Sequence, residues 1–184
     1  EELSTSRLVA LKLIPIAEAN SAAQRSEWIA EVRAAASVEH QNVVRLYRVE
    51  EAEKWFLLVF EFVSGGTLRD WLTTSASQNQ IARFVQTVAK AVSQIHQKKI
   101  LHLDLKPSNI LMDISAGRTW EEIVPKVSDF GISSGPETGL AENHAAALVR
   151  GTPAYMAPEQ FLGDPALLTA ATDVYGLGGL IYCM

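Results

Sequence analysis

The residues best suited to chemistry lie in the stretch 102–109, which reads His-Leu-Asp-Leu-Lys-Pro-Ser-Asn. Asp104 can orient a hydroxyl nucleophile and accept its proton, and Lys106 can neutralise the charge of a phosphoryl group in transfer. Asn109 can offer a neutral amide oxygen to Mg²⁺, and Pro107 stiffens the loop that carries all three. A polar turn between a helix and a strand would use the same residue types. Other segments of the chain decide between the two interpretations.

A second motif, Asp-Phe-Gly at 129–131, begins twenty residues after Asn109. Asp129 has a hard carboxylate oxygen that suits Mg²⁺, and Gly131 gives the backbone the freedom to aim it. The tripeptide alone would be an ordinary turn. Together with the stretch 102–109 it resembles the metal and catalytic loops of protein kinases. This resemblance implies a catalytic Asp104 and Lys106, Mg²⁺ ligands at Asn109 and Asp129, and a structural role for His102 beneath the loop.

The most specific run is Gly-Thr-Pro-Ala-Tyr-Met-Ala-Pro-Glu at 151–159, which resembles the kinase segment that positions the peptide substrate. Thr152 and Lys106 together indicate the serine/threonine branch. The resemblance then implies that the Thr152 hydroxyl braces Asp104 and Lys106. The run 172–176 resembles the start of the helix that supports the catalytic loop, where Asp173 would cap the helix and bond the loop backbone.

The beginning of the chain resembles the strand that carries the phosphate-binding lysine of kinases. Residues 7–14 alternate as a strand does, and they contain Val-Ala-Leu-Lys ending at Lys12. The resemblance implies that Lys12 holds the α and β phosphates and pairs with Glu31, in a helix predicted over 22–37. Glu27, one turn earlier, is the second candidate. The alternative without function is that Lys12 is an exposed lysine on an edge strand and that Glu31 is a solvated glutamate on an amphipathic helix.

Residues 55–63 predict a strand that resembles the segment of kinases in contact with adenine. By this resemblance Phe60 would be the gatekeeper residue beside the adenine site. Glu61 to Val63 would contact adenine through their backbone groups. A plain buried strand followed by a turn would have the same sequence. The resemblance also places two apolar residues from other segments, Ala10 and Leu111, in the nucleotide site.

The predicted elements give an α+β class and a two-lobed, protein-kinase-like fold that is incomplete, with one lobe over 1–63 and the other over 64–184. Residues 113–125 form a connection longer than a tight turn, with no functional interpretation. Residues 132–150 predict a mobile loop in which Ser133, Ser134 and Thr138 are candidate phosphoacceptors. The remaining predictions are strands at 43–49, 110–112 and 126–128, a charged turn at 50–54, a short helix at 67–72 and a long helix at 80–98.

Composition excludes several classes of partner. The chain has 184 residues, 48% hydrophobic and 20% charged, which is typical of a globular protein with a real core. A net charge of −5 without a basic run argues against nucleic-acid binding. The only cysteine, Cys183, predicts a buried reduced thiol and favours the cytoplasm. The apolar run 174–184 is too short to span a bilayer, no signal peptide is evident, and an anchor elsewhere stays open.

Three departures from the kinase pattern matter. No Gly-x-Gly-x-x-Gly sequence precedes Lys12, and the sequence ends within the helix that begins near Asp173. We therefore expect weak nucleotide binding, low activity, and marginal stability and solubility for this stretch alone. Leu103 occupies the position where the most familiar kinases have an arginine that meets a loop phosphate. Switching is therefore expected not to use phosphate pairing at the catalytic loop.

The function expected from these residues is phosphoryl transfer from ATP, with Mg²⁺, to serine or threonine hydroxyls of proteins. A pseudokinase, acting as a non-catalytic binding domain, is the alternative; the missing glycine loop favours it, and the complete catalytic set disfavours it. A small-molecule phosphotransferase should lack the run 151–159, which is present. The sequence indicates neither the substrate protein nor the oligomeric state.

Overall fold

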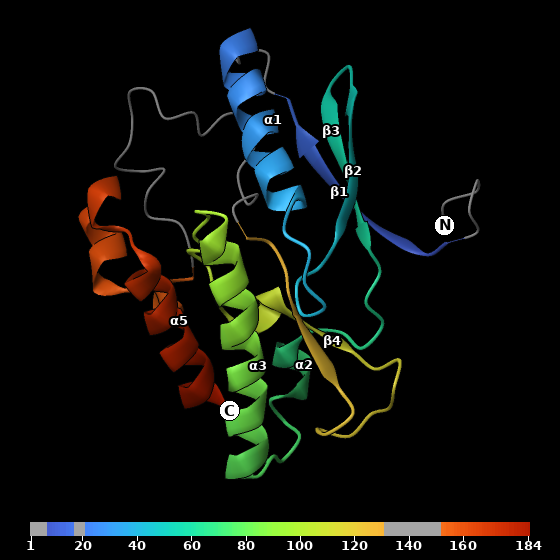
Figure 1. Ribbon diagram of the computed structural model, residues 1–184, viewed down its shortest axis with the longest axis vertical. Helices are drawn as coiled ribbons and strands as arrows, with labels where there is room; N and C mark the ends of the chain where they lie inside the picture. The colour runs from blue at the N-terminus through green and yellow to red at the C-terminus, as the bar shows by residue number, and fades with distance from the viewer. Residues whose placement is uncertain (1–6, 17–20, 131–151) are drawn as a thin grey trace.

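The computed structural model describes residues 7–16, 21–130 and 152–184, and it has the α+β architecture predicted from the sequence. An antiparallel sheet with one long helix forms one part of the molecule, and a mainly helical part lies beside it (Figure 1). The strands are β1 (Val9–Pro15), β2 (Leu46–Ala52), β3 (Trp55–Glu61), β4 (Ile110–Asp113) and β5 (Val124–Val127); the helices are α1 (Ala22–Ala36), α2 (Leu68–Trp71), α3 (Gln78–Gln97) and α5 (Ala170–Cys183).

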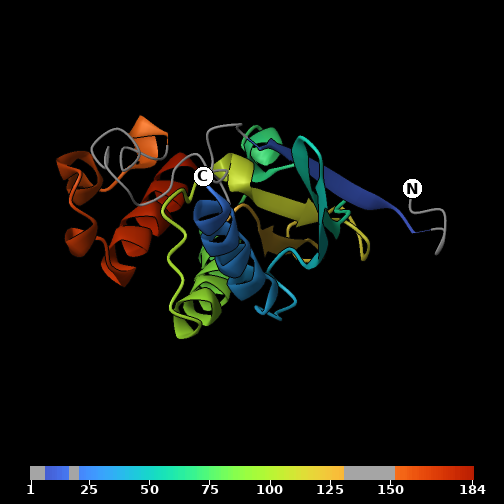
Figure 2. The same ribbon diagram turned by 90° about the horizontal axis from the view of Figure 1, so that it is seen from above.

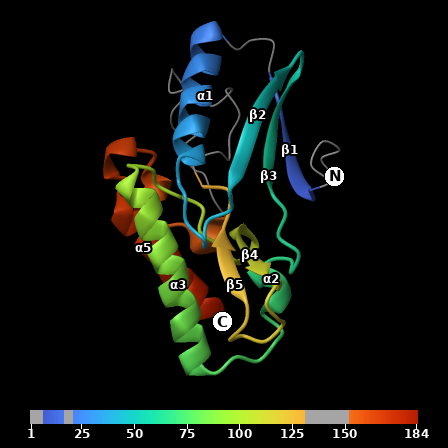
Figure 3. The ribbon, with the colours of Figure 1, turned by 45° about the vertical axis from the view of Figure 1, so that its right-hand side comes forward.

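The larger sheet has the antiparallel order β1-β3-β2, and α1 lies along one of its faces (Figure 3). The central strand β3 buries Phe56 and Leu58 completely. Trp28 of α1 packs on Phe56 with 4.5 Å between ring centroids, so this aromatic pair fixes the helix to the sheet. On the edge strand β1, Leu11 and Leu13 are exposed, and the opposite face carries Lys12.

The strand predicted at 43–49 is displaced along the chain. β2 begins at Leu46 and continues to Ala52, which pairs with Trp55, so the expected charged turn at 50–54 shrinks to two residues. Residues 42–44 pair instead with β5: the Val44 N–H donates to the Val127 carbonyl at 2.9 Å. The prediction was wrong here because residues 42–44, whose sequence also suits a strand, pair with the other sheet. Periodicity cannot show which sheet a segment joins.

The helical part is built around α3, whose apolar stripe recurs at three- and four-residue steps as predicted. The helix begins two residues earlier than expected because Ser77 and Gln80 form a reciprocal cap: each side chain bonds the backbone N–H of the other. Against this stripe lies the antiparallel pair β4-β5, with Ile110 opposite Val127. The buried residues of the stripe are Phe84, Val85, Val88, Ala91, Val92 and Ile95.

The connection between β4 and β5, for which the sequence suggested no role, carries an aromatic anchor. Trp120 packs edge-on against Trp71 of α2 and Phe84 of α3, with ring centroids 5.9 and 5.6 Å apart. Edge-to-face aromatic contacts add to the stabilisation from burial. The connection therefore ties α2 to the beginning of α3.

The last helix, α5, lies beside α3, and both appear on the side of the molecule away from β1 in Figure 2. Its N-cap is Thr169, whose hydroxyl accepts from the Ala171 N–H at 3.3 Å, so the prediction that Asp173 caps the helix was wrong. Cys183 is only partly buried, not fully as predicted, and its thiol donates to the Leu180 carbonyl at 3.2 Å. None of the described helices is both long and apolar enough to cross a membrane.

Two glycines of α5 offer a matched test of its packing. A methyl group at Gly176 would lie 2.8 Å from Leu105 Cβ, whereas one at Gly178 would meet nothing within 4 Å. We expect Gly178→Ala to raise the free energy of unfolding by about 0.5–1 kcal/mol, because alanine favours a helix. Gly176→Ala should lower it by about 1–3 kcal/mol, because the helix must move off the Leu105 loop.

Urea denaturation of both variants and the unchanged protein measures the two effects. Equal shifts in the same direction at Gly176 and Gly178 would contradict the close contact between α5 and Leu105.

Candidate active site

The loop that follows α3 brings three predicted residues into one network. The Lys106 ammonium lies 2.7 Å from Asp104 Oδ2, and the Asn109 amide nitrogen donates to the same oxygen at 2.9 Å. Asn109 Nδ2 also donates to the Asp104 backbone carbonyl at 2.8 Å. A 3₁₀ turn over Pro107–Asn109 makes this possible, because it folds Asn109 back toward Asp104.

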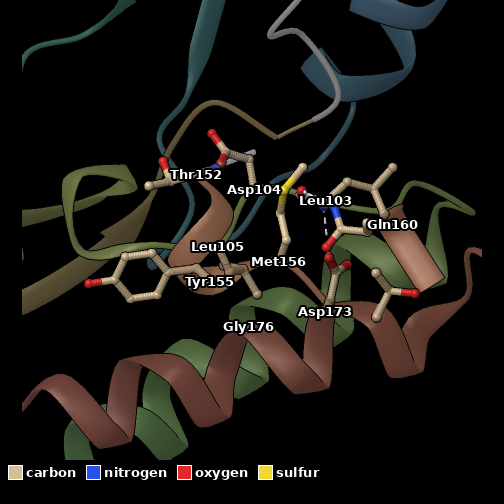
Figure 4. A pocket seen from close by; sticks show the side chains of 10 residues that line it. Leu103, Asp104, Leu105, Thr152, Tyr155, Met156, Gln160, Asp173 and Gly176 are labelled. Carbon is tan, nitrogen blue, oxygen red and sulfur yellow. Dashed lines mark hydrogen bonds between the residues drawn. The ribbon is translucent and has the colours of Figure 1, made fainter. Parts of the chain in front are cut away.

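Thr152 also reaches Asp104. Its backbone N–H donates to Asp104 Oδ1 at 3.3 Å, so each carboxylate oxygen of Asp104 has a partner. The expectation was a contact through the Thr152 hydroxyl; the contact that the structure describes is through the main chain. Figure 4 shows Thr152 and Asp104 adjacent, above helix α5.

Asp173 holds the backbone of the loop. Its carboxylate accepts from the His102 N–H at 2.8 Å and the Leu103 N–H at 2.7 Å, and it also lies 2.7 Å from His96 Nε2. Leu103 has a φ of +61°, a left-handed conformation that costs a residue with a Cβ about 1–2 kcal/mol. The bonds from Asp173, which is 1% exposed, offset that cost and fix the turn that presents Asp104.

His102 lies beneath the loop and is 1% exposed. Its Nδ1 accepts from the Asp104 N–H at 3.3 Å, so Nε2 carries the proton and donates to the Ser128 carbonyl at 3.0 Å. Burial lowers the pKa of His102, although the carboxylates of Asp173 and Asp104 oppose this shift. A neutral imidazole in this place links the two loops and is not suited to act as a base.

A cleft of about 180 Å³ lies between β1, β3 and the loops that carry Ser108 and Asp129. Most of its wall is apolar, and the ionisable residues among those that line it are Lys12, Glu61 and Asp129. Val63 is not part of the wall. The lining residues include six predicted ones, Ala10, Lys12, Phe60, Glu61, Leu111 and Asp129, and four that the sequence did not single out, Leu11, Val44, Ser108 and Ser128.

The ion pair at the charged part of the cleft differs from the expected one. Lys12 pairs with Asp129 Oδ1, while the expected partner Glu31 lies at an exposed position of α1. The buried face of α1 is formed by Trp28, Val32 and Ala35, and Glu31 lies outside that stripe. Lys12 therefore reaches the carboxylate that shares its cleft. The side chain of Glu27, the second candidate, is outside the described part of the structure.

Asn109 and Asp129, the expected metal ligands, are joined through Ser128. The backbone N–H and hydroxyl of Ser128 donate to the Asn109 carbonyl at 2.9 and 3.1 Å. Both described bonds of the Asn109 side chain use Nδ2, so its amide oxygen keeps its lone pairs for a cation. Asp129 has a φ of +57°, which turns its carboxylate toward the cleft. One carboxylate and one amide oxygen fit Mg²⁺, which takes few protein ligands and completes its shell with phosphates and water.

Glu61 uses its side chain and its backbone differently. The carboxylate pairs with Lys126 of β5 and accepts from the Arg45 N–H at 3.0 Å. The residue nonetheless contributes to the wall of the cleft. The side chain thus holds the end of β3 in place, which leaves the backbone as the part that can meet a ligand.

Comparison with known proteins agrees with this geometry. The family model described as the protein kinase domain matches residues 2–184. The chain belongs to the protein kinase domain family. The kinase fold inferred from the motifs is thereby confirmed, with a small antiparallel sheet and a mainly helical part.

Similar kinases come from distant organisms. Serine/threonine-protein kinase PrkC of Bacillus subtilis is 29% identical over 99% of this chain and 27% of its own length. Serine/threonine-protein kinase ULK1 of Homo sapiens is 35% identical over 83% of this chain and 14% of its own length. Maternal embryonic leucine zipper kinase of Xenopus laevis is 33% identical over 84% of this chain and 22% of its own length. The kinase domain described here thus spans less than a third of these relatives.

Some functional candidates lie where the structure gives no description, and others were missed. The candidate phosphoacceptors Ser133, Ser134 and Thr138 fall outside the described residues. Val44 was missed because it enters the cleft through pairing with β5, which only the fold reveals. Gln160 is 4% exposed and contacts the catalytic loop. It directly follows the Ala-Pro-Glu motif, and that adjacency was the available signal.

The buried His102 predicts a pH-dependent stability. Histidine in an unfolded chain has a pKa near 6.5, and the pKa of His102 in the folded protein lies below that value. At a pH between these two pKa values, the unfolded chain therefore binds more protons than the folded chain. The contribution of His102 is therefore complete above about pH 6.5 and is lost as the pH falls toward the folded pKa. We expect the free energy of unfolding to decrease from pH 7 to pH 5, and His102→Gln to flatten that decrease.

Urea denaturation of both proteins at pH 5, 6, 7 and 8 gives the two slopes. His102→Gln should also cost about 1–3 kcal/mol at pH 8, because the Ser128 carbonyl loses a well-placed donor. Parallel slopes in the two proteins would show that His102 does not titrate as described.

Proposed function

We propose that this domain is the catalytic part of an ATP-dependent serine/threonine protein kinase that requires Mg²⁺. The observation that carries the proposal is the shared network of Asp104, Lys106 and Asn109, together with a cleft that holds Lys12 and Asp129. The five residues come from three separate segments of the chain. A polar turn without catalytic function would not need this arrangement. Relatives named as serine/threonine kinases support the substrate class.

Each residue then has a distinct task. Magnesium ATP supplies the γ-phosphoryl group and a leaving group, ADP. Asp104 orients the substrate hydroxyl and accepts its proton as the oxygen bonds to phosphorus and the bond to the ADP oxygen breaks. Lys106 neutralises charge on the group in transfer, and Lys12 holds the α and β phosphates. Asn109 and Asp129 hold the metal.

We further propose that Lys12 changes partner when nucleotide binds. Asp129 cannot serve Mg²⁺ fully while its oxygen is paired with the Lys12 ammonium. Glu31 lies on the helix that covers the sheet carrying Lys12, and it is exposed and charged. A shift of α1 toward the cleft would bring Glu31 to Lys12 and release Asp129. The arrangement described here is then the resting one of two states.

The boundary between two lobes is proposed to lie after Val63, at the glycine pair 65–66. A Cβ on Gly65 would lie 2.0 Å from the Met112 carbonyl oxygen, so the chain passes tightly against β4 there. The Met112 N–H donates to the Gly66 carbonyl at 2.9 Å. Residues 1–63 would then form the nucleotide-covering lobe and 64–184 the substrate lobe.

The base role of Asp104 predicts a loss of turnover. Asp104→Asn in the full-length protein should lower kcat by on the order of 10²-fold or more, because the amide cannot accept the hydroxyl proton. Asp113→Asn is the matched control: its carboxylate accepts a hydrogen bond from the Ser115 N–H at the end of β4, away from the cleft. Transfer of radiolabelled phosphate from ATP to a generic basic protein measures both.

A non-catalytic binding domain is the competing function, and the same assay separates it. Absence of transfer by the unchanged full-length protein, with nucleotide binding retained, would establish the pseudokinase alternative. Equal activity of Asp104→Asn and Asp113→Asn would contradict the base role.

The partner exchange of Lys12 predicts a specific effect of Glu31. Glu31→Gln should lower kcat by about tenfold, because Lys12 then stays with Asp129 and the phosphates are poorly placed. Glu39→Gln, which removes an exposed carboxylate paired with Arg45, should leave kcat unchanged. Steady-state kinetics at saturating ATP and Mg²⁺ measure both, and an unaffected Glu31→Gln would refute the exchange.

A further inference from the structure

The main chain of Leu103, the residue before Asp104, is anchored at both of its polar groups from outside the loop. Its N–H donates to Asp173 Oδ1 at 2.7 Å, and its carbonyl accepts from Gln160 Nε2 at 2.8 Å. Leu103 is one of the few described residues other than glycine with a positive φ. A conformation of this kind persists only where its surroundings hold it in place.

The Gln160 side chain fits this position in a single orientation. Its Oε1 accepts from the Ala157 N–H at 2.9 Å, while Nε2 donates to the Leu103 carbonyl. An N–H can only donate and a carbonyl can only accept, so the two contacts require one acceptor and one donor at the end of one side chain. An ionised carboxylate satisfies one contact, and a thioether satisfies neither.

The surroundings leave little room for water to replace this amide. Gln160 is 4% exposed, and the interior space that it lines with Leu103, Asp104 and Asp173 measures about 10 Å³. That volume is at the lower limit for one water molecule. Figure 4 shows Gln160 next to Leu103, with Asp173 beneath them. Loss of the amide would therefore leave the Leu103 carbonyl without its donor.

The segment 152–160 thus contacts the catalytic loop at two points on either side of the reacting group. Thr152 holds the Asp104 carboxylate through a main-chain N–H, and Gln160 holds the carbonyl just before Asp104. Leu103 cannot pair with a phosphate, since its side chain is apolar. The contact through Gln160 is neutral and needs no modification of the chain.

We propose that Gln160 is a positioning residue for Asp104: its amide ties the peptide-binding segment to the catalytic loop and thereby sets the aim of the carboxylate. This inference rests on the proposed function and adds a residue to it. The tether acts on the chemical step and not on nucleotide binding, because neither Gln160 nor Leu103 lines the cleft that holds Lys12.

Gln160→Met in the full-length protein tests the tether, since methionine keeps the volume and removes the bonds to Leu103 and Ala157. We expect kcat to fall about 10- to 100-fold, because a small displacement of a catalytic group has effects of that size, with KM for ATP unchanged. Gln80→Met is the matched control. Gln80 also caps its own turn, accepting from the Ser77 N–H at 2.6 Å, and donates to Glu121 at 2.5 Å, but it lies at the far end of α3.

Gln80→Met should lower stability, because it removes the cap at the start of α3, and it should leave kcat unchanged. Rates are expressed per folded molecule, from the folded fraction measured by circular dichroism. A kcat for Gln160→Met within twofold of the control would overturn the proposal. So would a loss that appears only in KM for ATP.

The pH dependence of kcat in Gln160→Glu is a second measurement, and a purely structural role of Gln160 would not affect it. A protonated carboxyl can donate to Leu103 and accept from Ala157, as the amide does, whereas the ionised form cannot donate. The titratable groups that line the same space are the carboxylates of Asp173 and Asp104 and the phenol of Tyr155, and burial beside carboxylates raises the pKa of the introduced group. The kcat of Gln160→Glu, divided by the kcat of the unchanged protein at the same pH, should therefore rise at least about threefold from pH 8 to pH 6. A ratio independent of pH would overturn the proposal.

A measurement without catalysis separates this inference from the proposed function. Hydrogen–deuterium exchange of the peptide covering 100–106 should be faster in Gln160→Met than in Gln80→Met. If the unchanged protein transfers no phosphate but this difference is seen, the proposed function fails and the tether stands. If phosphate transfer is normal and exchange is equal in both variants, the tether fails alone.

Discussion

The buried carboxylate of Asp173 is the interaction on which the catalytic part of this domain depends. An ionised group that is 1% exposed is tolerated only when it is fully hydrogen-bonded. Here its partners are two successive backbone N–H groups of the catalytic loop and the imidazole of His96 at the end of α3. The last helix, the longest helix and the reacting loop are thus joined at one side chain. The close packing of Gly176 against Leu105 holds α5 against the same loop.

Much of this arrangement could be predicted because chemistry and periodicity are local properties of a sequence. The stripe of α3 follows from the 3.6-residue period, and the closeness of Asp104 and Asn109 follows from their place in one short motif. The roles proposed for them come from the resemblance to kinases. The kinase family is therefore recognisable from the sequence alone. The tripeptide at 129–131 shows the limit of this reasoning, because it gained meaning only through its distance from Asn109.

The predictions that failed depend on which segments meet in space. Residues 42–44 look like the start of β2 and pair with β5 instead, and Val44 enters the cleft for that reason. Lys12 was expected to pair with Glu31 and pairs with Asp129, since the choice between two carboxylates depends on the position of α1. The role of the connection between β4 and β5 became visible only when Trp120 was found against Trp71 and Phe84. Periodicity carries no information on such contacts.

The backbone of the described residues joins the sheet part and the helical part of the kinase domain at two separate places. One is the pairing of residues 42–44 with β5, and the other is the passage of Gly65 and Gly66 against Met112. A body attached at two points can turn only about the line between them, so the pair of contacts leaves one easy rotation and resists twisting or sliding. Rotation about that line would change the width of the cleft, and it would move Lys12 relative to Asp129, whose ion pair spans the two parts.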